Sequence, residues 1–170
     1  MPQYERRVAI LGRRRGAPEE TVLASKSNLA TTYSMLGRLD EALLLREEVY
    51  AGRVKLDGYR GEDTLIATSN YAVALLDLER YAEAKSILRK AIPNARRTLG
   101  AEHDLTLNFR RIYAECLCRD GSRDDIAEAV AIYEDVLQRT RRIFGDDHPS
   151  WRRLPELLGA AREFLASSDT

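Results

Sequence analysis

The feature of this sequence that most constrains its fold is an internal repeat. The triplet Asn28-Leu29-Ala30 reappears 42 positions later as Asn70-Tyr71-Ala72, and 42 positions later again as Ile112-Tyr113-Ala114. A single unit of this length cannot bury its own apolar face, so similar units have to stack on one another to form a continuous core. The repeat therefore predicts a short array of stacked units.

Each unit is predicted to contain two antiparallel helices. In the first unit these span about residues 22–36 and 39–56, ended by Gly37 and by Asp57-Gly58. Apolar residues recur at spacings of three, four and seven, which places them on one stripe of a helix. In the first helices the stripe contains Leu23, Ala30, Tyr33, then Leu65, Ala72, Leu75, then Leu107, Ala114, Leu117. The period-two alternation of strands is absent, so the expected fold is all-α.

The second helices repeat as well, and they define the limits of the units. Residues 37–42 match 79–84, but the third copy at 124–129 lies three positions further on, which indicates a three-residue insertion near Asp120-Gly121-Ser122. We therefore expect an α-solenoid of antiparallel helix pairs with about eight helices. Its predicted parts are an N-terminal helix at 1–20 from a partial preceding repeat, repeats at 21–63, 64–105 and 106–150, and a C-terminal capping helix with a frayed tail at 151–170.

Composition narrows the classes of function. Apolar residues make up 44% of the 170 residues, charged residues make up 32%, and the formal net charge is zero. This balance argues against disorder, and it argues against nucleic-acid binding, which favours a basic chain. Arg13-Arg14-Arg15 is interpreted as a solvated helix end. The apolar run at 8–11 is too short for a signal peptide and no run approaches the ~20 residues that span a bilayer, so we expect a cytoplasmic protein without membrane contact.

The residues that could suggest catalysis have simpler explanations. His103 and His148 occupy equivalent places in two units, so turn packing and hydrogen bonding at a helix start account for both. Cys116 and Cys118 stand two apart on a predicted helix and face different directions, which disfavours a disulfide between them. No nucleophile–base pair, glycine-rich phosphate loop or two-histidine metal motif is recognisable. The expectation is a protein that is not an enzyme and has no cofactor or metal.

The joins between units carry a resemblance to a known family. Residues 99–104 read Leu-Gly-Ala-Glu-His-Asp, and residues 144–149 read Phe-Gly-Asp-Asp-His-Pro. With Arg80-Tyr81-Ala82-Glu83-Ala84, these joins resemble the tetratricopeptide repeat, in the 42-residue form found in kinesin light chains. The resemblance covers about residues 22–149. It implies that the first helix of each pair lines a concave face, where an asparagine before the small residues contacts the backbone of a bound peptide.

The matching asparagines are Asn28 and Asn70, whereas the third unit has Ile112 at that position. Other candidate groove residues are Ser27, Thr31, Ser69, Val73, Arg110, Arg111 and Glu115. The alternative is that both asparagines bond only within their own repeats. Arg110 and Arg111 would favour an acidic peptide or a C-terminal carboxylate, because arginine forks onto carboxylates; the alternative is that they are solvated charges.

Three functions remain open from the sequence. The first is a protein–protein interaction module that binds a peptide or partner protein on its concave face. The second is a structural subunit of a larger assembly that uses its convex face or ends, for which exposed aromatic residues would serve as anchors; the candidates are Tyr50, Tyr59, Phe109 and Trp151. The third is a non-catalytic regulatory segment of a larger enzyme or signalling protein. The sequence leaves the oligomeric state open.

Overall fold

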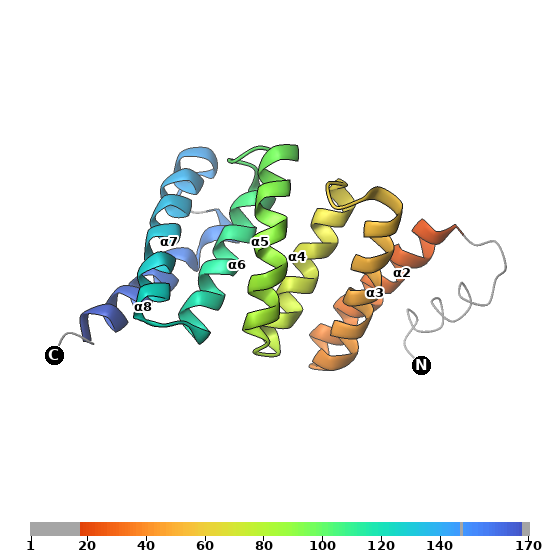
Figure 1. Cartoon of the computed structure of the whole chain (residues 1–170), viewed down its shortest axis with the longest axis horizontal. Coiled ribbons are helices and arrows are strands. Elements are labelled where there is room, and N and C mark those ends of the chain that lie inside the picture. Colours follow the sequence, from red (N-terminus) through yellow and green to blue (C-terminus); the bar gives the residue numbers. More distant parts are fainter. Residues whose placement is uncertain (1–17, 147, 168–170) are drawn as a thin grey trace. The chain divides into compact units, whose positions relative to one another are not determined.

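The structure is a computed structural model that describes residues 18–146 and 148–167. All regular secondary structure in these ranges is helical, which confirms the expected all-α fold. The elements are α2 (Glu19–Met35), α3 (Leu39–Asp57), α4 (Glu62–Asp77), α5 (Tyr81–Thr98), α6 (Asp104–Asp120), α7 (Arg123–Phe144), the 3₁₀ turn η1 (Pro149–Trp151) and α8 (Leu154–Ser167) (Figure 1). The helix expected before residue 16, the basic triplet at 13–15 and the tail at 168–170 lie outside the described residues.

The chain divides into two compact units, residues 1–79 and residues 80–170, called unit 1 and unit 2 below. Unit 1 contains α2 to α4, and unit 2 contains α5 to α8. The division falls between α4 and α5, within the segment 64–105 that was assigned to one repeat. The repeat boundaries therefore stay a prediction.

In unit 1, α3 packs against both α2 and α4 (Figure 1). Leu29, Tyr33 and Ala42 form a buried cluster between α2 and α3, with Leu45 packed against it. Gly52 on α3 allows close approach, because a Cβ atom added there would lie 2.6 Å from Cδ2 of Leu23 on α2.

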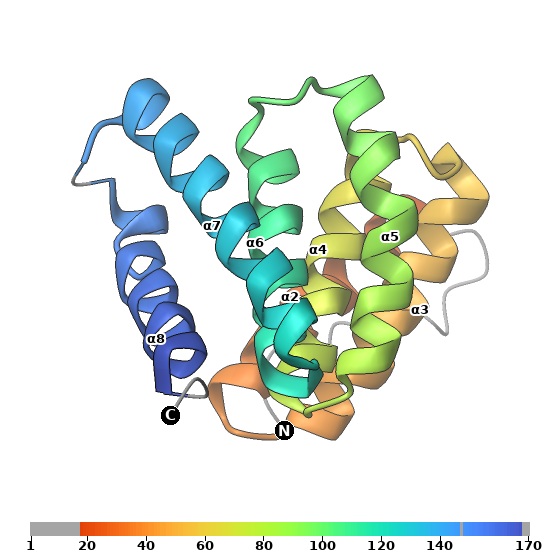
Figure 2. The same cartoon turned by 60° about the vertical axis from the view of Figure 1, so that its left-hand side comes forward.

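In unit 2, α6 packs between α5 and α7, and α8 packs against α7 (Figure 2). Its core is formed by large side chains that are fully buried, including Leu88, Leu107, Ile112, Leu117 and Val136. Across both units, all nine members of the predicted stripe on the first helices are buried, which confirms the helical period read from the sequence.

Five helix ends in the described residues adopt a positive φ, four at glycines and one at a glutamate. Gly37 follows α2 with a φ of 74°, and Gly58 follows α3 with a φ of 69°. Both positions suit glycine, which has no Cβ to clash there. Glu79 holds the position after α4 that matches Gly37, and it adopts a φ of 59°. The repeat therefore keeps this backbone conformation where it has lost the glycine.

The three-residue insertion adds a helical turn to the start of α7. The residue that matches Leu39 and Tyr81 is Ile126, yet α7 already begins at Arg123. A capping box holds this extra turn: the Ser122 side chain accepts from the Asp125 backbone N–H at 3.3 Å, and the Asp125 carboxylate accepts from the Ser122 backbone N–H at 2.8 Å. Both bonds satisfy N–H groups that a helix start leaves free.

Two of the four aromatic residues expected at the surface are buried, so that expectation was wrong for them. Phe109 is 0% exposed because α6 is covered on two sides by α5 and α7. Trp151 is buried because the η1 turn folds it against Phe144, with ring centroids 6.5 Å apart. Tyr59 is 61% exposed, as expected. Tyr50 is half-buried and stacks on Tyr71 at 5.7 Å.

The two histidines lie at the starts of helical segments, and the final helix starts near Pro155. His103 caps α6, since its Nδ1 accepts from the Leu105 backbone N–H at 3.2 Å. His148 precedes η1 and packs on the Phe144 ring, with centroids 5.1 Å apart. Pro155 is the second residue of α8, so the helix starts late, at Leu154. The predicted hydrogen bond at a helix start is therefore confirmed for His103, whereas His148 packs in its turn without a side-chain cap hydrogen bond.

The cysteines are both free thiols. Cys116 is buried, and burial raises its pKa to about 12. Such a thiol carries almost no reactive thiolate near neutral pH. Within the described residues, no group of three or more His, Cys, Asp or Glu side chains is arranged to hold a metal ion.

Candidate functional site

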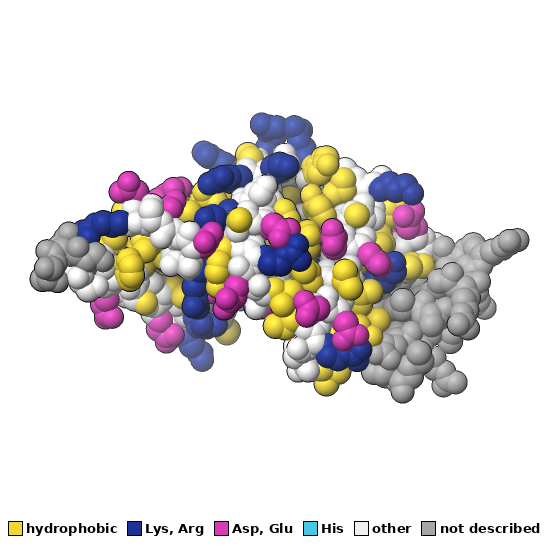
Figure 3. Space-filling model, turned by 60° about the horizontal axis from the view of Figure 1, so that its bottom comes forward, with side chains coloured by type: hydrophobic (Ala, Val, Ile, Leu, Met, Phe, Trp, Pro, Cys, Tyr) yellow, Lys and Arg dark blue, Asp and Glu magenta, His cyan; other side chains and the backbone are white. Residues whose placement is uncertain are grey.

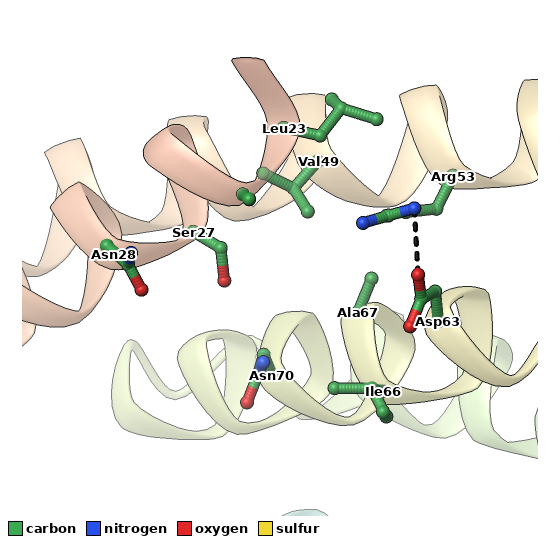
Figure 4. Close-up of a pocket in the computed structure, with 10 residues that line it drawn as sticks. Leu23, Ser27, Asn28, Val49, Arg53, Asp63, Ile66, Ala67 and Asn70 are labelled. Carbon is green, nitrogen blue, oxygen red and sulfur yellow. Dashed lines mark ion pairs between the residues drawn. The ribbon is translucent and has the colours of Figure 1, made fainter. Parts of the chain in front are cut away.

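A cleft of about 230 Å³ opens in unit 1 between α2, α3 and α4 (Figure 4). Each of these three helices contributes side chains to it. The lining residues are Leu23, Ala24, Ser27 and Asn28 from α2, Val49 and Arg53 from α3, and Asp63, Ile66, Ala67 and Asn70 from α4. The cleft is therefore built by one helix pair together with the first helix of the next.

Two amide side chains stand at one end of the cleft. Asn28 on α2 and Asn70 on α4 are both exposed, and Figure 4 shows them across the cleft from each other with Ser27 beside them. The 42-residue register places both asparagines at the same turn of their helices. Each amide offers two N–H donors and one carbonyl acceptor, which matches the donors and acceptors of a peptide backbone.

The floor of the cleft is apolar, and the far end carries one guanidinium group with an excess of carboxylates around it. Leu23, Val49 and Ala67 are buried, while Ile66 is 46% exposed and reaches the opening. At the far end, Nη1 of Arg53 lies 2.8 Å from the Asp63 carboxylate (Figure 4). Two further carboxylates lie near the same atom, Asp57 at 3.5 Å and Glu20 at 3.8 Å. Arg53 therefore has little unbalanced charge to offer a ligand.

Arg46 on α3 positions the α4 wall of the cleft, and sequence reasoning missed it. Its Nη1 donates to the Asn70 backbone carbonyl at 2.6 Å, and its Nη2 donates to Ser34 Oγ on α2 at 3.1 Å. One side chain thus joins all three helices. Burial lowers the pKa of this guanidinium, an effect that nearby Asp77 opposes. The available signal was that the matching positions of the later repeats hold Leu88 and Tyr133, so an arginine is unusual there.

Of the six candidate residues in unit 1, three line the cleft: Ser27, Asn28 and Asn70. Ser69 is only 7% exposed, so it belongs to the packed side of α4. Thr31 is exposed, but its hydroxyl donates to the Ser27 backbone carbonyl at 3.1 Å. Val73 is half-buried and does not line the cleft.

The three candidates in unit 2 are held by other side chains of the same unit. Arg110 pairs with Asp135 on α7. Arg111 pairs with Glu115 on its own helix at 2.9 Å and donates to the Asn108 side-chain oxygen at 3.0 Å. The two arginines therefore have different partners and do not form one fork for a carboxylate.

The charged surface around these helices is mixed. Figure 3 shows one face on which basic and acidic side chains are interspersed, with apolar side chains between them. No helix in the described ranges has the length and apolar character needed to cross a membrane.

Comparisons with known proteins agree with this architecture. One family model described as tetratricopeptide repeat matches residues 63–125, and another with the same description matches residues 22–56 and 121–150. Together the two models match more than half of the chain. A search of curated proteins finds no match.

Several solved structures are similar to the chain. A putative kinesin light chain from Podosopora anserina with nearly identical TPR-like repeats is 26% identical, with a TM-score of 0.73 over 94% of this chain and 74% of that one. A single-residue variant of the same protein is 24% identical, with a TM-score of 0.71 over 98% and 85%. BtubC (BKLC) from P. vanneervenii is 15% identical, with a TM-score of 0.77 over 94% and 63%, and shows the fold alone. The chain belongs to the tetratricopeptide repeat family, with repeats of the kinesin-light-chain-like kind.

Proposed function

We propose that this chain is a protein–protein interaction module, and that the cleft of unit 1 binds an extended peptide segment of a partner protein. The observation that carries the proposal is the placement of Asn28 and Asn70 across one cleft, with an apolar floor between the helices. Membership of the tetratricopeptide repeat family supports the general function. The cleft residues are the more specific part of the proposal.

The chemistry of the cleft suits a main chain with one apolar side chain. The two amides can pair with backbone N–H and C=O groups whatever the partner's sequence, at about 0.5–1.5 kcal/mol for each bond. Leu23, Val49 and Ile66 offer apolar surface to a side chain of the peptide. An acidic partner forms no part of this proposal, because Arg110 and Arg111 lie in unit 2 and already pair with carboxylates.

The test begins with selection of binding peptides from a displayed random library, followed by calorimetric titration of the best binder. Loss of both amides in the Asn28→Ala/Asn70→Ala double variant should weaken binding by about 1–3 kcal/mol, which is roughly 5- to 150-fold in Kd. Asn94→Ala on α5 is the matched control, since Asn94 does not line the cleft. An unchanged Kd in the double variant would overturn the assignment of the cleft.

A structural role in a larger assembly is the second candidate, and exposed apolar residues favour it. Met35 and Leu36 at the end of α2 are 83% and 61% exposed, and Tyr59 also lies at the surface. Multi-angle light scattering at increasing protein concentration tests self-assembly of the chain. A mass that rises for the wild type but stays monomeric for Met35→Gln/Leu36→Gln would support this role. A monomeric wild type would contradict self-assembly through these residues.

A further inference from the structure

A second cavity, of about 300 Å³, lies in unit 2 between α5, α6 and α7. Its polar lining consists of Arg96 from α5, Thr106 and Arg110 from α6, and Asp135 and Arg139 from α7. We propose that this cavity binds a phosphate group, either as inorganic phosphate or as the phosphate monoester of a phosphorylated side chain. The proposal does not depend on the cleft of unit 1.

The charge of the lining favours an anion. Three guanidinium groups face a single carboxylate, so the lining carries a net charge of +2 at neutral pH. Asp135 accepts from Nε of Arg139 at 2.9 Å and pairs with Arg110. Arg139, and then Arg110, hold the pKa of the Asp135 carboxyl below its usual value, so it stays ionised and neutralises one of the three cations.

The ion pair nearest to the lining leaves this charge unchanged. Glu102 lies 3.5 Å from Nη1 of Arg139, but it also pairs with Arg142, so this acid–base pair leaves the net charge unchanged. Arg96 has no ion pair in the part of the chain that the structure describes, and it is exposed at the end of α5. A phosphate dianion would balance the two excess charges, and its oxygens suit the paired donors of guanidinium groups.

A buried hydroxyl adds a donor that lacks a partner. Thr106 is 1% exposed, lines the cavity, and its Oγ1 has no hydrogen-bond partner among the described residues. Buried hydroxyl groups are usually paired, so an unpaired one calls for an explanation. Thr106 is the third residue of α6, where the positive end of the helix dipole also favours an anion.

Unit 1 contains a natural control for this hydroxyl. Thr64 is the repeat equivalent of Thr106, and it is equally buried and also without a hydrogen-bond partner among the described residues. However, the positions that match Arg96 and Arg110 hold Val54 and Thr68, which carry no charge. The hydroxyl is therefore common to two repeats, whereas its combination with a basic cavity occurs at Thr106.

The proposal is tested by calorimetric titration of the protein with sodium phosphate. The pH is about 7.5, where the phosphate dianion predominates, and sodium chloride keeps the ionic strength constant. Saturable binding by the wild type is expected. Arg96→Gln and Thr106→Val should each weaken it by at least about fivefold, because each removes one donor to the anion. The matched controls are Arg97→Gln, the adjacent arginine outside the cavity lining, and Thr64→Val; both should bind as the wild type does. Circular dichroism checks that every variant is folded.

A second arm distinguishes the two sources of the phosphate group. A short peptide containing phosphoserine and its unphosphorylated form are titrated under the same conditions. Tighter binding of the phosphopeptide than of inorganic phosphate would assign the cavity to a phosphorylated partner, and the reverse order would assign it to the free ion. No saturable binding of either, or equal affinities for the wild type, Arg96→Gln and Thr106→Val, would overturn the proposal. Neither result would bear on the cleft of unit 1.

Discussion

Replacing Phe109 by alanine tests the packing of unit 2 most directly. Phe109 is 0% exposed on α6, between α5 and α7, so its whole ring has left water. Loss of a buried phenyl group removes its transfer free energy, and the cavity left behind adds a further cost. The two together amount to about 3–5 kcal/mol. The control in the same unit is Phe164→Ala on α8, at a side chain that is 53% exposed, which should change the free energy of unfolding by about 1 kcal/mol or less.

The assay is equilibrium unfolding in urea, followed by fluorescence. The chain has one tryptophan, Trp151, which is buried in unit 2 and therefore reports the unfolding of that unit. With a urea m-value of about 1 kcal/mol/M for a small unit, Phe109→Ala should lower the midpoint by about 3–5 M, or leave unit 2 unfolded without urea.

A milder variant keeps the test informative if the alanine variant does not fold. Phe109→Leu retains most of the buried volume and should cost less than about 1.5 kcal/mol, a midpoint shift below about 1.5 M. The reasoning is refuted if Phe109→Ala shifts the midpoint no further than Phe164→Ala does, since Phe109 would then not be part of the core of unit 2.

Four other predictions concern separate features. Arg46→Leu should lower the free energy of unfolding of unit 1 by about 1.5–3 kcal/mol, because the Asn70 carbonyl and Ser34 lose a charged donor. Urea unfolding followed by circular dichroism measures this change. An unchanged midpoint would show that Arg46 does not hold the helices together. Gly37→Ala should lower the free energy of unfolding by about 1 kcal/mol in the same assay, since the φ of Gly37 is 74°. An increase of the same size would contradict the observed backbone conformation. The pKa of Asp125 is lowered by hydrogen bonds from the backbone and side chain of Ser122, so its contribution to stability is present above the unfolded pKa of about 3.9 and is lost as pH falls through the folded pKa. Asp125→Asn should therefore make the urea midpoint less sensitive to acid below about pH 4, and an identical pH profile would argue against the capping box. Cys116, with a pKa of about 12, should react with a thiol reagent at about pH 8 much more slowly in the native protein than in urea. Mass spectrometry of the labelled peptide measures the two rates. Equal rates would indicate an accessible thiolate.

The fold could be predicted well because its signals are local and repeated. A helical stripe depends on residues three to seven positions apart, and three copies of the pattern reinforce one another. The ends at Gly37 and Gly58 were equally readable, since glycine stands where the backbone turns left-handed. Glu79 shows the limit of that signal: only its alignment with Gly37 indicates the conformation, because the residue itself does not favour it.

The candidate site could be predicted in part. Asn28 and Asn70 do line one cleft, because the register places them on equivalent turns of two helices. Ser69 directly precedes Asn70, so its side chain points about 100° away around α4, and it is buried. Arg46 was missed, since its contacts reach 12 and 24 residues away in sequence.

Sequence alone thus determined the helical class, the period and the family, all of which follow from spacing within one unit and its repetition. The tertiary structure of each unit decided which polar groups meet and which aromatic residues are covered. Arg110 and Arg111 are adjacent in the chain, yet one bonds to α7 and the other to its own helix, because neighbouring positions on a helix point about 100° apart. Phe109 is buried for a related reason: α6 has neighbours on two sides, and periodicity within one helix does not reveal how many faces are covered.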